Sequence, residues 1–343
     1  MPDAPPPLPP PRPRVLSGMR PTGTLHLGHY HGALKNWVRL QATHDCFFFV
    51  ADWHALTTHY QDRSAIESNV YDMVVDWLAA GLDPEQATIF IQSRMPEHAE
   101  LFTLLAMSTP SSWLERMPSY KDQVEKNREL ATFGFLGYPL LQAADILIYK
   151  AALVPVGEDQ AAHVEVTREV ARRFNRIYGG KTDDSARILP EPQALLTETS
   201  KLQGLDGFKM SKSAGNAIAM RDEPAVVEDK IRRMPTDPQR VRRSDPGDPA
   251  RCPVWAFHEL YSDDATRAWA ETGCKSAGIG CLDCKQPVID AIQREQAPWR
   301  ERAAEILANP KQVHWIVELG TERARAVARK TLKEVRVAMG LVY

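Results

Sequence analysis

The amino-acid sequence predicts an α/β protein built on a doubly wound parallel sheet, with a smaller all-helical C-terminal domain. Four short, unbroken apolar runs carry the β-branched and aromatic residues typical of buried parallel strands, at residues 14–18, 46–52, 88–93 and 153–156. Longer segments between them repeat apolar residues with the helical period. Because strand and helix alternate, we expect right-handed crossovers and a ligand site outside the carboxyl ends of the strands.

The clearest helix is predicted after the second strand. It begins at Ser64, a suitable N-cap, and ends at Gly81, a suitable C-cap, with apolar residues at helical spacing between them. Further helices are predicted at residues 136–148, 158–178, 223–234, 290–307 and 312–339. The last two make the C-terminal third helical.

Length and proline content divide the chain into three parts. At roughly 100–200 residues per domain, 343 residues correspond to about two domains. Eight of residues 2–13 are proline, which lacks the backbone donor that helices and sheets need, so we expect a disordered leader at 1–13. The α/β domain is expected at 14–220 and the helical domain at 221–343.

The sequence shows no sign of a membrane or secretory destination. No apolar run approaches the roughly 18 residues that span a bilayer, and the N-terminus lacks the apolar stretch of a secretory signal. We therefore expect a cytoplasmic protein without a membrane partner.

The overall charge conceals a local imbalance. Lys and Arg number 42 against 44 Asp and Glu, and the net charge of −2 does not by itself indicate a nucleic-acid partner. Residues 321–343, however, hold six basic and two acidic side chains, and a second basic cluster comprises Arg240, Arg242 and Arg243. Such spacing suits either a solvated helix face or phosphate contacts, and both interpretations stay open.

A turn and a helix start follow the first strand. Residues 21–37 read PTGTLHLGHYHGALKNW, and the helix is expected to begin near His26 or Leu27. Its N-terminus offers unpaired N–H groups and a positive dipole end, which suit a phosphate. Gly28 would let a ligand approach the backbone, while His26 and His29 share one face. The segment contains neither a Walker loop nor a dinucleotide fingerprint. The alternatives to a phosphate site are a purely structural helix start and a metal site.

A second candidate segment lies nearly two hundred residues later. Residues 209–213 read KMSKS and are flanked by Gly207 and Gly215. Two ammonium groups and two hydroxyls on a glycine-bounded loop could close over a polyphosphate and neutralise charge as a bond to phosphorus breaks. A solvated basic loop is the simpler interpretation of this segment alone.

Together the two segments resemble the paired signatures of class I aminoacyl-tRNA synthetases, HLGH and KMSKS. Other stretches resemble one family of that class, the tryptophanyl-tRNA synthetases: ADWHALTT from Ala51, FLGYPLLQAADILIY from Phe135 and VPVGEDQ from Val154. The resemblance spans about residues 14–213 strongly and the helical remainder more loosely. It implies a Rossmann-like catalytic domain that includes the KMSKS loop, and a helical domain on the anticodon side of a tRNA.

The resemblance implies activation of an amino acid by ATP. The carboxylate attacks the α-phosphorus and pyrophosphate leaves, so catalysis consists of positioning and charge stabilisation, with Mg²⁺ sharing the pyrophosphate charge. The residues expected to be catalytic are His26, His29, Lys209 and Lys212. The wider ATP site is expected to comprise Arg20, Pro21, Thr22, Gly28, His29, Gly157, Glu158, Asp159, Lys209, Met210, Ser211, Lys212 and Ser213.

The resemblance also implies a pocket for tryptophan. Asp145 is expected to accept the indole N–H and Gln160 to reach the ammonium group, and the other expected pocket residues are Tyr138, His54, Val154 and Val156. The alternatives are a buried Asp145 paired with an arginine, and acidic residues that only cap the helix after Gly157. Phenylalanine would leave the buried carboxylate unpaired, whereas tyrosine is the harder competitor.

Two positions depart from the family's pattern. Arg20 stands where glutamine is common, and it would add a positive donor near the nucleotide. Gln142 stands where methionine commonly lines the indole pocket, so this pocket is expected to differ in detail.

Four of the five cysteines crowd into the C-terminal third. Cys252, Cys274, Cys281 and Cys284 have the spacing C-x21-C-x6-C-x2-C, and the odd total argues against a disulfide framework. Thiolates suit zinc or an iron–sulfur cluster, and the spacing resembles that of the subset of the family with a [4Fe–4S] cluster. We expect the cluster, with zinc or unligated thiols as alternatives. Cys46 is expected to be a buried apolar residue.

The resemblance therefore implies a tryptophan–tRNA ligase that uses ATP, L-tryptophan and tRNA(Trp) and acts as a homodimer. The tyrosyl relative is the nearest alternative. A non-enzymatic tRNA-binding or iron–sulfur-sensing paralogue is the more distant one, because it has no physical reason to keep a triphosphate-activating loop.

Overall fold

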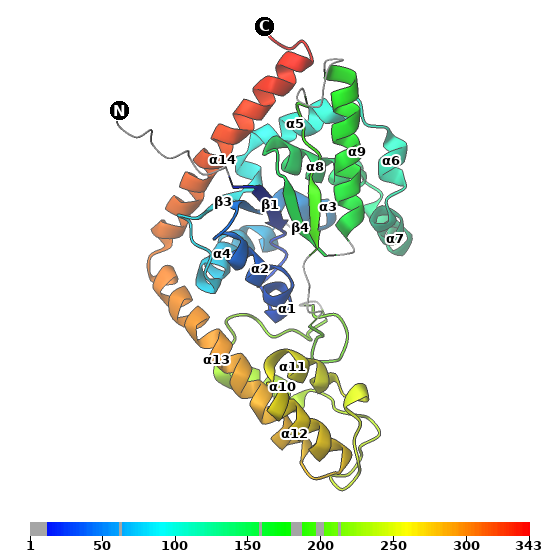
Figure 1. Ribbon diagram of the computed structural model, residues 1–343, viewed down its shortest axis with the longest axis vertical. Coiled ribbons are helices and arrows are strands. Elements are labelled where there is room, and N and C mark those ends of the chain that lie inside the picture. The colour runs from blue at the N-terminus through cyan, green and yellow to red at the C-terminus, as the bar shows by residue number, and fades with distance from the viewer. Residues whose placement is uncertain (1–11, 62–63, 158–159, 180–186, 197–201, 212–213) are drawn as a thin grey trace, which may run out of the picture.

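The chain folds around a five-stranded parallel sheet (Figure 1). The computed structural model describes residues 12–61, 64–157, 160–179, 187–196, 202–211 and 214–343. The strands are β1 (Arg14–Met19), β2 (Asp45–Val50), β3 (Ala87–Ile91), β4 (Leu153–Val156) and β5 (Gln193–Leu196). They lie in the order β3-β2-β1-β4-β5, and every neighbouring pair is parallel. The predicted doubly wound sheet is confirmed. β5 escaped prediction because it is mostly exposed and has no long apolar run.

The strand order places a switch point between β1 and β4. From β1 the chain moves outward to β2 and β3, and it then crosses back to β4 and β5 on the other side of β1. Open α/β sheets bind ligands at such a point, beyond the carboxyl ends of the strands. The HLGH segment follows β1 and Gly157 follows β4, so the fold brings both predicted nucleotide segments to this edge.

Helices cover both faces of the sheet and one end of it. The N-terminal part contains α1 (Leu27–His29), the π-helix η1 (Tyr30–Leu34), α2 (Lys35–Leu40), α3 (Asp52–His59), α4 (Ser64–Ala80), η2 (Gln92–Arg94), α5 (Pro96–Ala106), α6 (Ser111–Glu115), α7 (Pro118–Lys126), η3 (Arg128–Leu130), α8 (Phe133–Ile148) and α9 (Ala161–Tyr178). The C-terminal part contains α10 (Pro224–Arg233), η6 (Pro249–Arg251), α11 (Pro253–Tyr261), α12 (Asp264–Lys275), α13 (Cys281–Ala308) and α14 (Pro310–Ala338). The predicted helical C-terminal region is confirmed.

Alternate side chains of each strand enter different apolar cores. In β2, Phe48 and Val50 join the core that α2 and α4 cover, whereas Phe47 and Phe49 join the core that α5, α8 and α9 cover. This alternation is the two-residue period of a strand. Because both faces are buried, the strands read as unbroken apolar runs, which is the pattern that predicted them.

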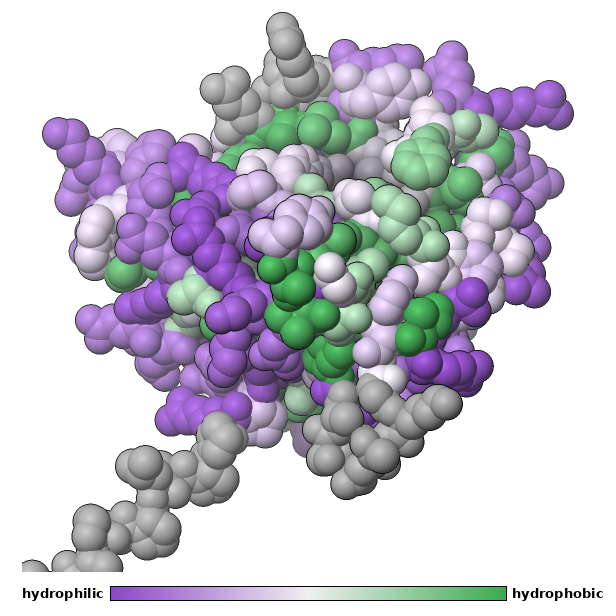
Figure 2. Space-filling view, turned by 90° about the horizontal axis from the view of Figure 1, so that it is seen from above, coloured by the Kyte–Doolittle hydropathy of each residue, from purple (hydrophilic) through white to green (hydrophobic). Residues whose placement is uncertain are grey.

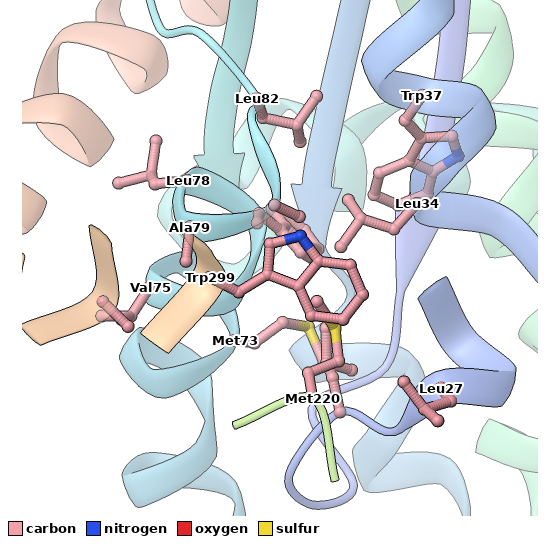
Figure 3. Packing of buried hydrophobic residues seen from close by; sticks show 14 of the residues in the cluster. Leu27, Leu34, Trp37, Met73, Val75, Leu78, Ala79, Leu82, Met220 and Trp299 are labelled. Atoms are coloured by element: carbon pink, nitrogen blue, oxygen red, sulfur yellow. The ribbon is translucent and has the colours of Figure 1, made fainter. Parts of the chain in front are cut away.

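The last two helices join the C-terminal part to both cores. Helices α10 to α12 lie below the sheet in Figure 1, and α13 and α14 run from there back along its β3 edge. Trp299 of α13 packs beside Met73 and Met220 (Figure 3), with its ring 4.2 Å from that of Tyr30. Gly320 of α14 lies so close to β3 that a Cβ there would be 1.8 Å from the Ile89 carbonyl oxygen. The boundary expected at residue 220 stays a prediction.

The surface is mixed in character. Seen from above, hydrophilic side chains cover much of the molecule, and apolar ones gather near the middle of that face (Figure 2). Within the described residues, no helix is both long and apolar enough to cross a membrane. Of the predicted leader at residues 1–13, residues 1–11 lie outside the described residues.

Candidate functional site

The two histidines of the HLGH segment lie against each other at the start of α1. Their ring centroids are 3.7 Å apart, and the His26 backbone N–H donates to Nδ1 of His29 at 3.3 Å. Burial lowers the pKa of His26 to about 4, and the Lys209 charge adds to the effect. Burial, His26 and Lys209 lower the pKa of His29 to about 3. Both rings are therefore neutral near pH 7, so they act as hydrogen-bonding groups and not as cations.

The KMSKS loop meets this helix start at Gly28. A Cβ on Gly28 would be 3.0 Å from the His26 ring and 3.5 Å from Cβ of Met210, which is itself buried. Glycine at this position thus permits the close approach of two segments that lie far apart in the sequence. The structure brings together four of the residues named from the sequence, His26, His29, Lys209 and Met210. Lys212 and Ser213 lie outside the described residues.

Backbone pairing fixes the approach of these two segments. The Leu27 N–H donates to the Ile218 carbonyl at 3.0 Å, and the Met220 N–H donates to the Leu25 carbonyl at 2.9 Å. Gln296 of α13 donates to the Ala219 carbonyl at 2.8 Å from behind. The chain after the KMSKS loop is thus anchored both to the HLGH segment and to the C-terminal helices.

Asn216 holds the described part of the KMSKS loop in shape. Its Oδ1 accepts from the Ser211 backbone N–H at 2.7 Å, and its Nδ2 donates to Asp206 at 2.8 Å and to the Lys209 carbonyl at 3.1 Å. The preceding Gly215 has φ +67°, which favours glycine. Sequence reasoning missed Asn216, because one asparagine beside a glycine predicts a turn but does not identify its partners.

The remaining predicted nucleotide residues lie around the switch point. Pro21 is buried and Thr22 is exposed after β1, while Gly157 is half-buried after β4. Arg20 is exposed, and its charge is close enough to Tyr138 to lower the phenol pKa, against the larger rise caused by burial. The predicted residues Glu158 and Asp159 lie outside the described residues.

Asp145 lies fully buried on α8 at the centre of a hydrogen-bond network. Oδ2 lies 2.7 Å from Nε2 of His54, and Oδ1 lies 2.6 Å from Nδ1 of His98. Gln92 donates to both oxygens, at 2.9 and 3.0 Å. Burial alone would raise the pKa of Asp145, but the His54 charge and the hydrogen bonds from His54 and His98 lower it to about 2. The partners are histidines and a glutamine, whereas the sequence analysis considered an arginine.

The ionised carboxylate determines the protonation of its neighbours. A carboxylate only accepts hydrogen bonds, so the facing nitrogens, Nε2 of His54 and Nδ1 of His98, must carry protons. Nε2 of His98 lies 2.6 Å from the Tyr149 hydroxyl, which can donate to it. Sequence reasoning missed His98, Gln92 and Tyr149, although all three follow or end apolar elements that the sequence predicts.

A second polar cluster lies beside this network. The Tyr138 hydroxyl lies 2.5 Å from Ser119 Oγ and 2.9 Å from Nε2 of His163, whose Nδ1 lies 2.7 Å from Oε1 of Gln160. The rings of His54 and Tyr138 face each other edge-on at 6.4 Å, which links the two clusters. Val154 is buried on β4 and Val156 is half-buried at its end. Of the predicted pocket residues, Asp145, His54, Tyr138 and Gln160 therefore form one connected set, with Ser119 and His163 as unpredicted members.

The four clustered cysteines line one small cavity between α11, α12 and α13. The other lining residues include Asp237, Arg240 and Lys285. Burial raises the pKa of Cys284 to about 12, and the charges of the three other cysteines add to the effect. All four are free thiols. Among the described residues, no group of three or more His, Cys, Asp or Glu side chains has the arrangement of a metal site. Cys46 is buried in β2, as expected.

The basic residues of α14 make contacts within the molecule. Arg336 binds Glu100 at 2.6 Å, and Arg329 and Arg325 lie 3.2 and 3.4 Å from Glu97. Arg323 donates to the Pro84 carbonyl at 2.8 Å. Four of the six basic side chains of this segment thus join α14 to the N-terminal part, which neither interpretation of the charge pattern anticipated.

Comparisons with known proteins agree with this geometry. The model of the family of class I tRNA synthetases for tryptophan and tyrosine matches residues 10–295. A tryptophan–tRNA ligase of Ralstonia nicotianae is 56% identical over 96% of this chain and 99% of that protein. Another, of Thermotoga maritima, is 51% identical over 96% of this chain and 100% of that protein.

Solved structures are similar over the same span. A tryptophanyl-tRNA synthetase from Campylobacter jejuni, complexed with ADP and tryptophan, has a TM-score of 0.84 at 32% identity and covers 96% of this chain and 100% of its own. A tyrosyl-tRNA synthetase from Archaeoglobus fulgidus has a TM-score of 0.63 at 26% identity, over 85% of this chain and 90% of its own.

Proposed function

Since the chain belongs to the class I tRNA synthetases for tryptophan and tyrosine, we propose that it activates L-tryptophan with ATP and transfers it to tRNA(Trp). Its activity is that of a tryptophan–tRNA ligase. The observation that carries this function is the similarity of nearly the whole chain to tryptophan–tRNA ligases at 56 and 51% identity. The proposed activity is also supported by geometry, because His26, His29 and Lys209 lie close together at the switch point.

The first step forms tryptophanyl-adenylate. A carboxylate oxygen of tryptophan bonds to the α-phosphorus of ATP, the bond from this phosphorus to the bridging oxygen breaks, and pyrophosphate leaves with that electron pair. No proton is transferred, because the carboxylate is already ionised. His26 and His29 donate hydrogen bonds as neutral rings, and Lys209 and Lys212 supply positive charge to the leaving group. The wider ATP site is proposed to comprise the residues expected from the sequence, and Mg²⁺, when bound with ATP, would share the pyrophosphate charge.

The tryptophan side of the site rests on Asp145. Its ionised state makes it an acceptor for the indole N–H, with Tyr138, His54, Val154 and Val156 around the ring and Gln160 towards the ammonium group. Phenylalanine has no donor for this buried carboxylate. The discrimination against it is therefore expected to exceed the discrimination that one missing methylene group causes. In the second step, the terminal ribose hydroxyl of tRNA bonds to the adenylate carbonyl carbon and gives its proton to a phosphate oxygen, and AMP leaves as the bond from that carbon to the bridging oxygen breaks.

A four-thiolate metal centre is the proposed role of Cys252, Cys274, Cys281 and Cys284. They line one cavity that also holds two buried cations. Lys285 donates to the carbonyls of Arg232 and Met234, and Arg240 donates to two further carbonyls, so these contacts leave both charges uncancelled. Four thiolates around a [4Fe–4S] cluster or Zn²⁺ would leave a net negative charge that the cations balance. The cluster is the favoured occupant.

Elemental analysis tests this centre. Anaerobic purification followed by iron, sulfide and zinc determination is expected to give iron and sulfide in equal amounts. Zinc without sulfide would show that the four cysteines bind zinc and not a cluster. A protein that contains neither iron nor zinc would refute the metal centre.

The proposed assembly is a cytoplasmic homodimer, as the family resemblance implies. Large apolar side chains that are exposed in the single chain, among them Met107 and Phe133, are of the kind that a second copy would cover. Sedimentation of the purified protein is expected to give twice the mass of one chain, and a monomer at micromolar concentration would refute the dimer.

Pyrophosphate exchange into ATP, run with each of the twenty amino acids, tests the function. Exchange is expected with tryptophan, and aminoacylation with tRNA(Trp). Exchange with tyrosine in place of tryptophan would instead favour the sister specificity, which the same family model includes. An absence of exchange with all twenty would favour a non-enzymatic tRNA-binding protein.

A further inference from the structure

We propose that His98 and Gln92 are positioning residues that hold Asp145 as the acceptor of the indole N–H, and that His54 is the donor which the indole replaces. This inference rests on the proposed function, because it concerns the tryptophan side of that site. The site residues predicted from the sequence do not include His98 or Gln92.

Asp145 can accept only a limited number of hydrogen bonds. A carboxylate offers about four lone-pair positions. Oδ1 receives the hydrogens of His98 and Gln92, and Oδ2 receives those of His54 and Gln92. Three donor nitrogens therefore occupy both oxygens of the buried carboxylate, and a fourth donor, the indole N–H, would have to displace one of these side chains.

Burial and contacts show which donor can leave. His98 is fully buried and is held from the other side by the Tyr149 hydroxyl at 2.6 Å. Gln92 is fully buried, and its Oε1 accepts from the His54 backbone N–H at 3.4 Å. The side chain of His54 is 11% exposed, against 0% for His98, and it faces the ring of Tyr138. His54 is thus the donor on the side of the pocket.

The surroundings of His98 keep it in place. It lies in the first turn of α5, behind Pro96, and its neighbour Glu97 binds arginines of α14. The rings of Phe49 and Phe90 flank it at 6.1 Å each. The Tyr149 hydroxyl at Nε2 holds the ring so that Nδ1 meets Asp145. Hydrogen bonds of this kind fix both the orientation and the ionisation of a buried carboxylate.

Steady-state pyrophosphate exchange with the full-length protein tests the positioning role. His98→Leu removes the donor, and the KM for tryptophan is expected to rise about 10- to 100-fold while the KM for ATP stays unchanged. The kcat/KM for tryptophan of this variant is also expected to fall more steeply than that of the unmodified protein as the pH is lowered towards about 5, because the pKa of Asp145 rises. His98→Asn, whose amide places an N–H near the position of Nδ1, is expected to restore part of the affinity.

Leu101→Ala is the matched control, because Leu101 is buried on the same helix and faces the apolar core. It is expected to lower stability without changing the pH profile. If Leu101→Ala reproduces the effects of His98→Leu, they reflect weakened packing of α5 and the inference is overturned. It is also overturned if His98→Leu keeps the KM and the pH profile of the unmodified protein while Asp145→Asn loses tryptophan.

Nitrogen-15 NMR of the histidine rings tests the exchange of donors. On addition of tryptophan, the Nε2 signal of His54 is expected to shift and that of His98 Nδ1 to stay. The reverse pattern would overturn the assignment of His54 as the departing donor. No tryptophan-dependent exchange by the unmodified protein would overturn the proposed function, and with it this inference.

Discussion

The two sides of the candidate site treat their buried polar groups in opposite ways. On the tryptophan side, Asp145 receives hydrogen bonds from three side chains, and its pKa falls to about 2 despite full burial. On the nucleotide side, Nδ1 of His26 is buried and has no hydrogen-bond partner among the described residues. Burial also lowers the pKa of both signature histidines.

This difference separates stability from activity. Where the protein supplies every partner itself, removing the central group should cost both folding and binding. Where donors are left for a ligand, removing one should cost activity while folding is unchanged or improves. The predictions below test this contrast.

The largest effect is expected from Lys209→Met. Lys209 lies close enough to both signature histidines to lower their pKa values. Loss of a preorganised charge at a leaving phosphate typically slows chemistry by about 10²- to 10³-fold, so tryptophan-dependent exchange is expected to fall by that factor with unchanged stability. The exposed Lys311→Met is the control. A Lys209→Met rate within about threefold of the unmodified protein would contradict the assigned role.

Asp145→Asn is expected to affect folding and binding together. The amide cannot accept four hydrogen bonds, so buried donors lose a partner, and the free energy of unfolding is expected to fall by about 1–3 kcal/mol. The KM for tryptophan should rise as well. His26→Asn, in contrast, should reduce exchange while the free energy of unfolding is maintained. Urea titration measures the free energy of unfolding of both variants. Equal destabilisation by Asp145→Asn and His26→Asn would contradict the proposed difference between the two sides of the site.

Asn216→Ala is expected to slow the reaction less than Lys209→Met and also to lower stability, because Asn216 is buried and all its partners belong to the protein. The variant loses the three hydrogen bonds that hold the loop around Lys209 and Ser211. Misplacement of the loop should lower kcat about tenfold, and the KM for tryptophan should stay unchanged because the pocket lies on other elements. A change confined to that KM would show that the two sides are coupled through the loop.

Stability is also expected to depend on pH through the two signature histidines. Below the ordinary histidine value of 6.5, the unfolded chain binds protons that His26 and His29 take up only at about pH 4 and about pH 3. The free energy of unfolding therefore falls as the pH falls through this window. His29→Asn should flatten the slope between about pH 6 and about pH 4. An unchanged slope in chemical unfolding experiments would contradict the depressed pKa.

Much of the sheet and of the nucleotide side could be predicted from the sequence. Strands buried on both faces are unbroken apolar runs, and the two signatures are local strings whose resemblance identifies them. Asn216 could not be predicted, because an asparagine beside a glycine indicates a turn but not the partners of its side chain. His98 and Gln92 could not be predicted, because they contact Asp145 from 47 and 53 residues away in the sequence. The same holds for the basic side chains of α14, since their charge is visible in the sequence but their acidic partners on α5 are not.

Two parts of the prediction remain as such. Glu158, Asp159, Lys212 and Ser213 lie outside the described residues, so their roles rest on the family resemblance. The occupant of the cavity lined by the cysteines also stays a prediction. Four thiols adopt the geometry of a metal site only when the metal or cluster is bound.

The close contact between Gly320 and β3 also determines when the protein can complete its fold during synthesis. Val317 of α14 belongs to one core and Ala328 to the other, yet every strand leaves the ribosome before this helix does. Until α14 arrives, β3 keeps an open edge and both cores lack part of their cover. The nascent chain therefore passes through a state with exposed apolar surface, and this state is where chaperones would be needed.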